Sequence, residues 1–374
     1  MLIGIDGNEA NVERKVGIGE YSFELLRQFE EFKIPNLQFT IYLKNKPRSD
    51  MPRERDGWKY RVIGPKKFWT QFRLPLDLFF HKPRPDIFFT PSHYAPRFSP
   101  IPTAISIMDV SYIHFPELFK KSDLYQLRNW TAYSVRNSSK IFTISQASKD
   151  DIIKTYGVSG GKVSVTYPGV KLKNTMQNSK VLEDKYGIKG EYVLFVGTLQ
   201  PRKNIVRLIE AFSMLINTNS ERINPNINLV IIGKKGWLLE EILGAPKKFD
   251  VEDKVKFLDF VPDEDLPSFY KNALCFVLPS LYEGFGLPVL EAMKYGCPVI
   301  ASNTSSLPEA GGDAALYVNP LDVEDIVKNL ELIINNEKLR KELIEKGYEQ
   351  VKKFSWEKTA KETLKGLEGL MIKD

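Results

Sequence analysis

Short runs of strand character alternate with helical patterns along nearly the whole chain, and this alternation limits the fold more than any other feature of the sequence. In the first half the strand-like runs are LIGID (2–6), FTIYL (39–43), DIFFT (86–90), AISIM (104–108), KIFTI (140–144) and KVSVTY (162–167). In the second half they are YVLFVG (192–197), NLVIIG (228–233), VKFLDF (255–260), ALCFVLP (273–279) and PVIAS (298–302). Strands that alternate with helices form parallel sheets covered on both faces. Each half is therefore expected to be a doubly wound α/β domain.

The length also indicates two domains, because 374 residues exceed what a single hydrophobic core usually serves. Residues 168–190 are polar and lack strand character, so we expect the domain boundary there. The N-terminal domain would cover residues 1–170 and the C-terminal domain residues 190–350. Ligands of doubly wound sheets bind beyond the carboxyl ends of the strands, so the chemistry is expected in strand-to-helix loops.

The composition is that of an ordinary globular protein, and its formal net charge of +6 argues against nucleic acid as a main partner. The first residues, MLIGIDGNEA, have no basic leader, and no window approaches the ~18 apolar residues of a membrane-spanning helix. We expect a cytoplasmic protein, at most attached peripherally to the inner face of a membrane. The two cysteines, Cys275 and Cys297, lie in apolar stretches, which predicts buried, reduced thiols.

One stretch of the first half, from Lys44 to Pro85, is rich in basic and aromatic residues. One interpretation is a solvated loop followed by an amphipathic helix that packs on the core. The other is that residues 66–84 contact anionic lipid headgroups. The pattern favours the first interpretation and leaves the second open.

The segment PSLYEGFGLPVLEAMKYGCPVIASNTSSLPE, residues 279–309, predicts a strand, a glycine-containing loop and a helix of about two turns. Pro288 stands where a first helical turn tolerates proline, and Gly296 is expected to end the helix. The amides at the helix start could receive an anion such as a diphosphate. The loop residues expected to line this donor site are Gly284, Phe285, Gly286 and Leu287.

Two glutamates flank this loop and helix. Glu291 lies one turn into the helix, where a carboxylate can accept hydrogen bonds from the vicinal hydroxyls of a ribose. Glu283, on the loop, can approach the sugar side of the same ligand. Each glutamate alone could equally be an exposed acid favoured by the helix dipole. Their combination with two glycines and a proline in one strand-loop-helix unit is more specific.

A second candidate site is VGTLQPRKNIVRLIEAF, residues 196–212, where a strand ends at Gly197 and a helix follows. Arg202 and Lys203 lie at the junction and oppose the helix dipole. This local conflict is explained if an anion lies between the two cations. The alternative is a pair of solvated basic residues.

Two loops of the first half complete the candidate residues. Gly17 and Gly19 precede a helix but lack the third glycine of a dinucleotide fingerprint and the lysine of a P-loop, so they could form a turn without further function. SIMDVSYIHFPELFKK, residues 106–121, follows a strand and carries Met108 and Asp109.

The segment with the two glutamates, eight positions apart, resembles the donor-site signature of retaining glycosyltransferases of family 4. PSLYEGFGLPVLEAM and GCPVIASNTSSLPE match that pattern nearly residue for residue, and the resemblance extends to the ending FSWEKTAKETL. It implies the GT-B fold, in which two Rossmann-like doubly wound domains face each other across a cleft. It also implies that residues 355–374 form a helix that crosses back to the N-terminal domain.

The resemblance implies roles for the candidate residues. Glu291 would bind the nucleotide ribose and Glu283 would lie against the transferred sugar. Arg202 and Lys203 would clamp the donor diphosphate and stabilise the departing nucleotide. The loop of Gly17 and Gly19 would lie near the diphosphate and the acceptor.

Members of the family usually carry a histidine before the aspartate that contacts the transferred sugar, and this chain has Met108 before Asp109. A backbone carbonyl at Met108 could still contact a sugar hydroxyl, but an imidazole at that position is absent. His93 and His114 are nearby alternatives, and each is more often structural than catalytic in such a setting.

The implied reaction is transfer of a hexosyl unit to a hydroxyl of a saccharide or a lipid-linked saccharide, and mannosyl is the first candidate for that unit. The donor would be GDP-mannose or a UDP-hexose, without a cofactor or a metal. DED at 263–265 formally fits a metal-binding Asp-x-Asp, but it precedes a helical run and is better interpreted as helix-start acids. The alternatives are a non-catalytic sugar-nucleotide-binding protein and another enzyme of the same fold, such as an epimerase or a phosphorylase.

Overall fold

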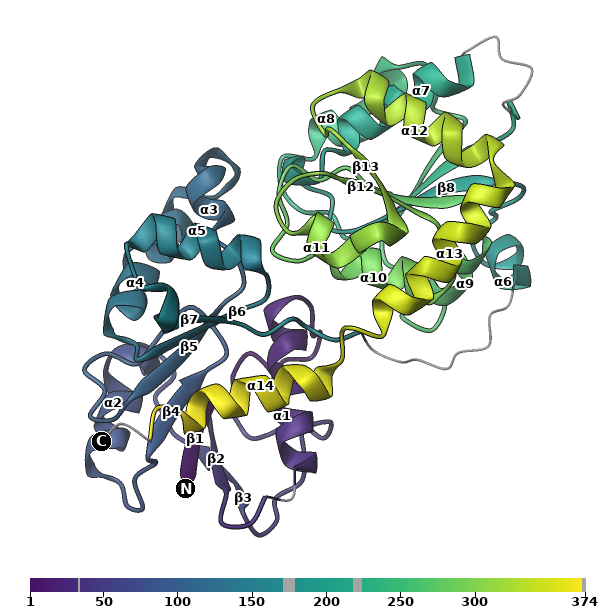
Figure 1. Ribbon diagram of the computed structural model, residues 1–374. Coiled ribbons are helices and arrows are strands. Elements are labelled where there is room, and N and C mark those ends of the chain that lie inside the picture. Colours follow the sequence, from purple (N-terminus) through teal and green to yellow (C-terminus); the bar gives the residue numbers. More distant parts are fainter. Residues whose placement is uncertain (33, 171–178, 218–223, 372–374) are drawn as a thin grey trace. The chain divides into compact units, whose positions relative to one another are not determined.

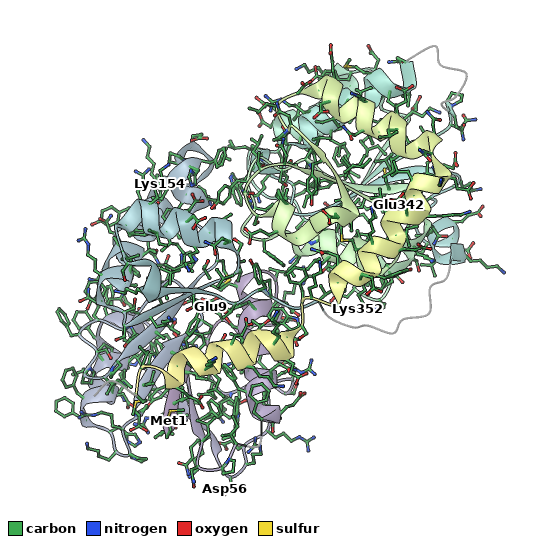
Figure 2. The ribbon with its side chains drawn as sticks, in the orientation of Figure 1. Met1, Glu9, Asp56, Lys154, Glu342 and Lys352 are labelled. Atoms are coloured by element: carbon green, nitrogen blue, oxygen red, sulfur yellow. The ribbon has the colours of Figure 1, made fainter. Side chains whose placement is uncertain are left out.

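A computed structural model describes all residues of the chain except 33, 171–178, 218–223 and 372–374. The chain divides into two compact units, each built around one parallel sheet (Figure 1). The first unit contains Met1–Gly169 and Phe354–Asp374, and the second contains Val170–Lys353. Side chains fill the space between the helices and the sheet of each unit (Figure 2).

The sheet of the first unit has seven parallel strands in the order β3-β2-β1-β4-β5-β6-β7. The strands are β1 (Leu2–Asp6), β2 (Gln38–Leu43), β3 (Trp58–Val62), β4 (Ile87–Thr90), β5 (Thr103–Ile107), β6 (Lys140–Thr143) and β7 (Val163–Val165). In β1, Ile3 pairs with Phe39 on one side and Ile87 on the other. All three side chains are buried, because helices cover both faces of a parallel sheet.

The helices of the first unit follow the strands as the alternating pattern predicts. They are α1 (Ile18–Glu31), α2 (Leu74–Phe80), α3 (Ser111–His114), α4 (Lys121–Asn137), α5 (Gln146–Tyr156) and α14 (Trp356–Glu368). A single turn of π-helix, Trp69–Arg73, leads directly into α2.

The last helix, α14, packs beside α1 within the first unit (Figure 1). Trp356 and Leu364 share the core that contains Ile3 and Leu25, and the Trp356 and Tyr21 rings lie 6.0 Å apart, edge to face. Thr359 Oγ1 donates a hydrogen bond to the carbonyl of residue 167. The C-terminal residues therefore complete the core of the unit that begins with Met1.

The sheet of the second unit has six parallel strands in the order β10-β9-β8-β11-β12-β13. They are β8 (Tyr192–Val196), β9 (Asn228–Ile232), β10 (Val255–Leu258), β11 (Cys275–Leu278), β12 (Val299–Ser302) and β13 (Ala315–Val318). The helices are α6 (Ser179–Asp184), α7 (Ile205–Asn217), α8 (Glu240–Lys248), α9 (Leu266–Asn272), α10 (Leu287–Lys294), α11 (Leu307–Gly311), α12 (Val323–Asn335) and α13 (Glu337–Val351). Cys275 and Cys297 are buried and form no disulfide, as expected.

The sequence interpretation missed two edge strands. The stretch from Lys44 to Pro85 was expected to be a loop and a helix, but it also contains β3, which pairs with β2. Its burial is limited to Trp58, because an edge strand has one neighbour and much of it faces solvent. At the other sheet, the missed strand is β13, a run of four residues of which only the first and the last are buried.

The stretch 168–190, expected to be a linker, contains α6. Residues 171–178 of that stretch lie outside the described part of the chain. The helices of the described chain are all too short or too polar to span a lipid bilayer.

Candidate active site

The strand order of the second unit identifies the place where a ligand is expected. From β8 the chain adds β9 and β10 toward one edge of the sheet, and it then returns to β11, which lies beside β8 toward the other edge. The loops after β8 and β11 therefore leave neighbouring strands in opposite directions. Such a topological switch point opens a crevice at the carboxyl edge of a doubly wound sheet.

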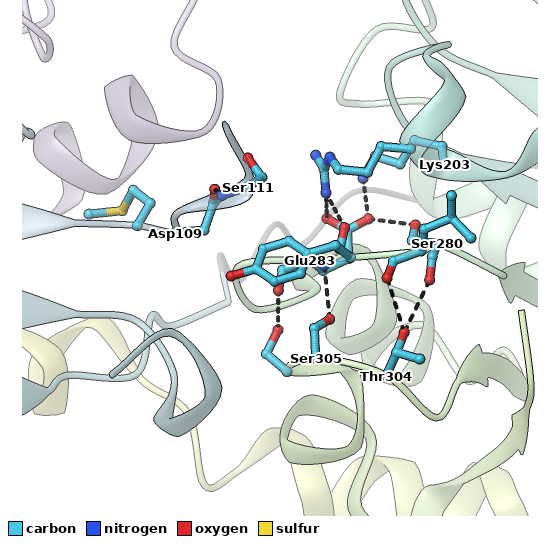
Figure 3. A network of polar contacts seen from close by, with 12 residues as sticks. Asp109, Ser111, Lys203, Ser280, Glu283, Thr304 and Ser305 are labelled. Atoms are coloured by element: carbon cyan, nitrogen blue, oxygen red, sulfur yellow. Dashed lines mark hydrogen bonds and ion pairs between the residues drawn. The ribbon is translucent and has the colours of Figure 1, made fainter. Parts of the chain in front are cut away.

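Glu283 stands in the loop after β11, and three side chains bind its carboxylate (Figure 3). Lys203 Nζ donates to Glu283 Oε1 at 2.5 Å, and Ser280 Oγ donates to the same oxygen at 2.6 Å. Arg202 Nη1 lies 3.2 Å from Glu283 Oε2. Arg202 and Lys203 come from the short 3-10 helix Pro201–Lys203 after β8, so the contact joins the two loops of the switch point.

In the described structure the negative charge that contacts both Arg202 and Lys203 is the Glu283 carboxylate, and a donor diphosphate at these cations remains a prediction. The carboxylate and Lys203 are both buried, with relative exposures of 7% and 8%. Burial raises the pKa of Glu283, but Lys203 and Arg202 outweigh this effect and hold the pKa at about 2. The three charged groups together carry one net positive charge.

The backbone of Glu283 is fixed as firmly as its side chain. Its N–H donates to Ser305 Oγ at 2.9 Å, and Ser306 Oγ donates to its carbonyl at 2.8 Å. The loop is also tied to the 3-10 helix, because Leu281 N donates to the Arg202 carbonyl at 2.9 Å. These bonds connect the loops after β8, β11 and β12 and position the carboxylate.

The helix start after Glu283 has the backbone that the glycines predicted. Gly286 caps α10 with a φ of 102°, which favours glycine, and a Cβ there would lie 2.6 Å from Leu307 Cδ2. Leu287 is the first residue of α10, and the preceding Gly284 and Phe285 are buried. The helix has eight residues and a proline in its first turn, as expected.

Glu291 lies on α10, half-buried, with a partner that the sequence did not indicate. The Tyr270 hydroxyl of α9 donates to Glu291 Oε2 at 3.1 Å. Burial raises the pKa of Tyr270, and the charge of Glu291 raises it further, so the phenol stays a donor. The Tyr270 ring stacks on Tyr295 at 6.0 Å, which keeps the hydroxyl in place.

Gly197, the last of the candidate residues of this unit, lies directly after β8. Its carbonyl oxygen would be 1.8 Å from a Cβ at Gly233, so the loops after β8 and β9 approach each other closely only with glycine at 233. A Cβ at Gly197 itself would lie 3.6 Å from Lys203 Cε. The second unit thus gathers Gly197, Arg202, Lys203, Glu283 and α10 at one edge of its sheet.

The first unit carries the other candidates at the carboxyl edge of its own sheet. Gly17 precedes α1 with a φ of 54°, and a Cβ there would meet nothing within 4 Å. Gly19 is buried, and a Cβ there would lie 3.1 Å from the carbonyl oxygen of Glu9. Gly17 therefore lies at an open position, and Gly19 allows α1 to pack against the loop after β1.

Met108 and Asp109 follow β5. The Met108 carbonyl accepts a hydrogen bond from Ser148 Oγ at 3.0 Å, so one of its two lone pairs has a partner in the protein. Asp109 Oδ1 accepts from Ser111 N at 2.8 Å and orders the turn into α3 (Figure 3). This contact gives Asp109 a structural task beside any contact with a substrate.

His93 lies in the loop after β4, next to the switch point between β1 and β4 of this sheet. Its Nδ1 atom is buried without a hydrogen-bond partner in the described structure. Burial lowers the pKa of His93, and the charge of Asp109 acts in the opposite direction. His114 instead lies 3.2 Å from Asp151 on the surface side of α3.

Sequence reasoning missed the residues that hold Glu283 and Glu291, namely Ser280, Ser305, Ser306 and Tyr270. The serines lie in the segment already singled out, but serines are common in loops and no spacing marks them.

Asp265 was expected to act as a helix-start acid, but its carboxylate accepts no hydrogen bond from a backbone amide of α9. It instead accepts from Lys185 Nζ and the Tyr186 hydroxyl, each at 2.6 Å. Among the described residues, no group of three or more potential ligands could hold a metal ion.

Comparison with known proteins identifies the family of the chain. Residues 17–174 match the model of glycosyltransferase family 4, and residues 179–350 match that of glycosyl transferases group 1. The O-antigen chain mannosyltransferase B of Escherichia coli is 30% identical over 93% of this chain and 94% of its own length. The serotype-specific mannosyltransferase WbdA of Escherichia coli is 32% identical over 62% of this chain and 29% of its own length.

The solved structures show the same fold at lower sequence similarity. Anabaena HepE in complex with UDP and glucose superposes with a TM-score of 0.74 and 16% identity, over 98% of this chain and 99% of its own. The two parallel sheets described above are those of the GT-B fold. The matches along nearly the whole length show that this chain belongs to glycosyltransferase family 4, group 1, and is a retaining hexosyltransferase.

Proposed function

We propose that the chain transfers a mannosyl unit from a nucleoside-diphosphate sugar to a hydroxyl of a saccharide or lipid-linked saccharide, with retention and without a metal. The observation that carries this proposal is the Glu283 carboxylate held between Lys203, Arg202 and Ser280 at the switch point of the second sheet. In this proposal residues 190–350 act as the donor domain. Residues 1–170 carry the acceptor-side candidates.

The charge of this cluster suits a donor diphosphate. Arg202 and Lys203 contribute two positive charges and Glu283 one negative charge, which leaves one net positive charge to attract an anion. The start of α10 would add a second attraction through the Leu287 N–H, since Pro288 has no N–H and Val289 N donates to the Gly286 carbonyl at 2.9 Å. As the bond to the sugar breaks, negative charge grows on the diphosphate, and these fixed groups stabilise it without reorganising.

Glu283 would act on the sugar side. Its pKa of about 2 keeps it ionised at neutral pH, so it can orient the sugar and stabilise positive charge on the anomeric carbon. Both carboxylate oxygens accept from cations or a hydroxyl, which reduces the nucleophilicity of Glu283. We therefore favour attack of the acceptor on the same face, with the leaving phosphate accepting the acceptor proton. A covalent intermediate is the alternative mechanism.

Glu291 would bind the ribose. Its Oε2 already accepts from Tyr270, and the carboxylate can accept further bonds from the vicinal hydroxyls of a nucleotide. Tyr270 fixes the side chain without neutralising it, because the raised pKa keeps the phenol protonated.

The relatives support mannose as the transferred sugar, because the O-antigen chain mannosyltransferase B and WbdA are both named mannosyltransferases. They also support a growing saccharide as the acceptor, since an O-antigen chain is one. GDP-mannose is the first donor to test. A UDP-hexose is the second, on the example of HepE with UDP and glucose.

The test combines donor selection with one substitution. Nucleoside diphosphates are first screened by thermal shift, because a specific ligand stabilises in proportion to the logarithm of its concentration over its dissociation constant. Transfer from the matching sugar nucleotide is then followed by NMR of the anomeric signal. Glu283→Gln should keep the affinity for the nucleoside diphosphate and lose most of the transfer. Unchanged turnover in Glu283→Gln, or a product of inverted configuration, would contradict the proposal.

A further inference from the structure

The helix that begins near Phe68 and ends at Phe80 is apolar on two opposite sides. On the inner side, Trp69, Leu74 and Leu78 are buried in a core with Tyr42 and Phe88. Trp69 Nε1 also donates to a backbone carbonyl, that of residue 63, at 3.1 Å. The packing of this inner side on the core agrees with the amphipathic helix that the sequence predicted.

The outer side is also apolar, and an ordinary amphipathic helix would be polar there. Its exposed side chains recur at helical spacing and form what we term the outer apolar face: Phe68 (56% exposed), Phe72 (64%), Leu76 (49%), Phe79 (43%) and Phe80 (80%). The Phe68 and Phe72 rings lie 6.2 Å apart, and those of Phe79 and Phe80 lie 6.4 Å apart. Four exposed phenylalanines on one short helical segment are a contiguous patch rather than scattered surface residues.

A second segment adds another exposed ring. Phe98 is 75% exposed, and the loop that carries it is bound to the helix, because Arg97 N donates to the Thr70 carbonyl at 2.9 Å. The backbone of Phe98 is held as well, because its N–H donates a hydrogen bond to the Tyr133 hydroxyl at 2.9 Å. Hydrogen bonds in the first unit therefore fix the backbone that carries this ring to the helical segment.

The charged residues of the segment that carries the outer apolar face are mostly basic. Between 66 and 84 the sequence has five basic residues, Lys66, Lys67, Arg73, Lys82 and Arg84, and one acid, Asp77. Asp77 is buried and accepts two hydrogen bonds of 2.6 Å from Arg61, so it does not offset the basic rim. Lys66, Lys67 and Lys82 are exposed.

We propose that the outer apolar face and Phe98 insert into the interface of an anionic lipid bilayer, with the surrounding lysines and arginines on the headgroups. Phenylalanine and leucine are suited to the boundary between headgroups and acyl chains, and each basic residue near an anionic surface adds attraction. This surface would bring the enzyme to a lipid-linked acceptor, and in that respect it deepens the proposed function. Its physical basis, exposed rings within a basic rim, is independent of the reaction.

The basic rim also argues against a second copy of the chain as the occupant. In a two-fold dimer formed through this face, the patch of one copy would meet the same patch of the other, which would bring together Lys66, Lys67 and Lys82 of both copies. Like charges at an interface oppose association. An anionic surface has the opposite charge and lacks this repulsion.

The experiment is sedimentation of the full chain with vesicles that contain no acceptor. We expect binding to vesicles of phosphatidylcholine mixed with phosphatidylglycerol and weaker binding to vesicles of phosphatidylcholine alone. Binding to the anionic vesicles should weaken as salt is added, because the Debye length falls to ~10 Å at 0.1 M ionic strength. Phe72→Ser with Phe80→Ser should lower the partition coefficient by at least roughly tenfold, because both rings leave water on insertion. Tyr125→Ser, which removes a ring that is 68% exposed on α4, is the matched control and should bind like the parent.

Donor hydrolysis in solution, without vesicles, separates this proposal from the proposed reaction. The Phe72→Ser and Phe80→Ser variant should hydrolyse the donor as the parent does, which also shows that it is folded. Absence of binding to any vesicle at low salt would overturn the membrane surface and leave the reaction untouched. Equal binding by the variant, or self-association without lipid that the variant loses, would overturn it as well.

Discussion

The ionised carboxylate of Glu283 should contribute about 3 kcal/mol to the unfolding free energy at neutral pH. Its ordinary pKa is 4.5 and its value in the folded chain is about 2, and each pKa unit corresponds to ~1.36 kcal/mol. Gln imitates the protonated acid in size and shape. Glu283→Gln should therefore lose about this amount, which for a unit of this size lowers Tm by roughly 6–12 °C.

The pH dependence has a defined sign. Because the pKa of Glu283 is lowered by folding, its contribution is fully present above pH 4.5 and is lost as the pH falls toward about 2. The difference in stability between parent and Glu283→Gln should be constant between pH 6 and 8 and should shrink below pH 4.5. Glu331→Gln, which removes an exposed glutamate of α12, is the control and should show little effect at any pH.

The assay is a double-mutant cycle on thermal unfolding with Glu283→Gln, Lys203→Met and the combination. Each single variant leaves a buried polar partner without its counter-charge, whereas the double variant removes both charges. We expect the double variant to be clearly more stable than the sum of the single effects predicts, by about 1–3 kcal/mol. Additive single effects would refute the reasoning, because they would mean that Lys203 and Glu283 do not stabilise each other.

Three further predictions concern catalysis. Glu291→Ala should raise the KM for the donor by the equivalent of about 1–3 kcal/mol with little change in kcat, since it removes hydrogen bonds to the ribose, and equal nucleotide affinity in variant and parent would count against that role. Lys203→Ala should lower kcat by a factor of roughly 10² to 10³ and Arg202→Ala by a similar or smaller factor, measured as initial rates at saturating donor. Transfer should continue at the same initial rate after exhaustive EDTA treatment, and activity that is lost on chelation and restored by magnesium or manganese would overturn the account of the diphosphate site.

The sheets were predictable where the strands are buried on both faces. In β9 and β11 nearly every residue is apolar, because helices cover both sides of a parallel sheet, and the sequence shows this as a continuous apolar run. The edge strand β3 lacks this signal, because charged residues interrupt it, whereas β13 is a short apolar run that was missed all the same. β3 is recognised only through its pairing with β2, a contact between segments that are separated in the sequence.

The candidate residues could be singled out from the sequence, but not the network that they form. Glu283 and the pair Arg202 and Lys203 were identified separately, and the dipole conflict at the second site was explained by an anion between the two cations; in the described structure the Glu283 carboxylate contacts both. That this anion is Glu283, about 80 residues away, follows only from the neighbouring positions of β8 and β11 in the sheet. The part of the site that depends on chain topology could not be obtained from local patterns.

The structure gives Glu283 a structural role beside the role proposed for it in the reaction, and a single substitution cannot separate the two. Lys203 is 8% exposed, and a buried ammonium without a counter-charge is strongly destabilising. Glu283 supplies that charge before any donor binds, so the residue proposed to face the sugar also holds the cation proposed to receive the diphosphate. Loss of activity in Glu283→Gln could then reflect either a lost contact with the sugar or a displaced Lys203.

The double variant tests whether the ion pair serves the reaction as well as the fold. Lys203→Met with Glu283→Gln should regain much of the stability, because neither buried charge remains, and yet transfer should stay at least as low as in Lys203→Ala. Stability would then recover in the double variant, whereas turnover would not. Recovery of turnover together with stability would show that the ion pair serves only the fold, and that other residues stabilise the departing nucleotide.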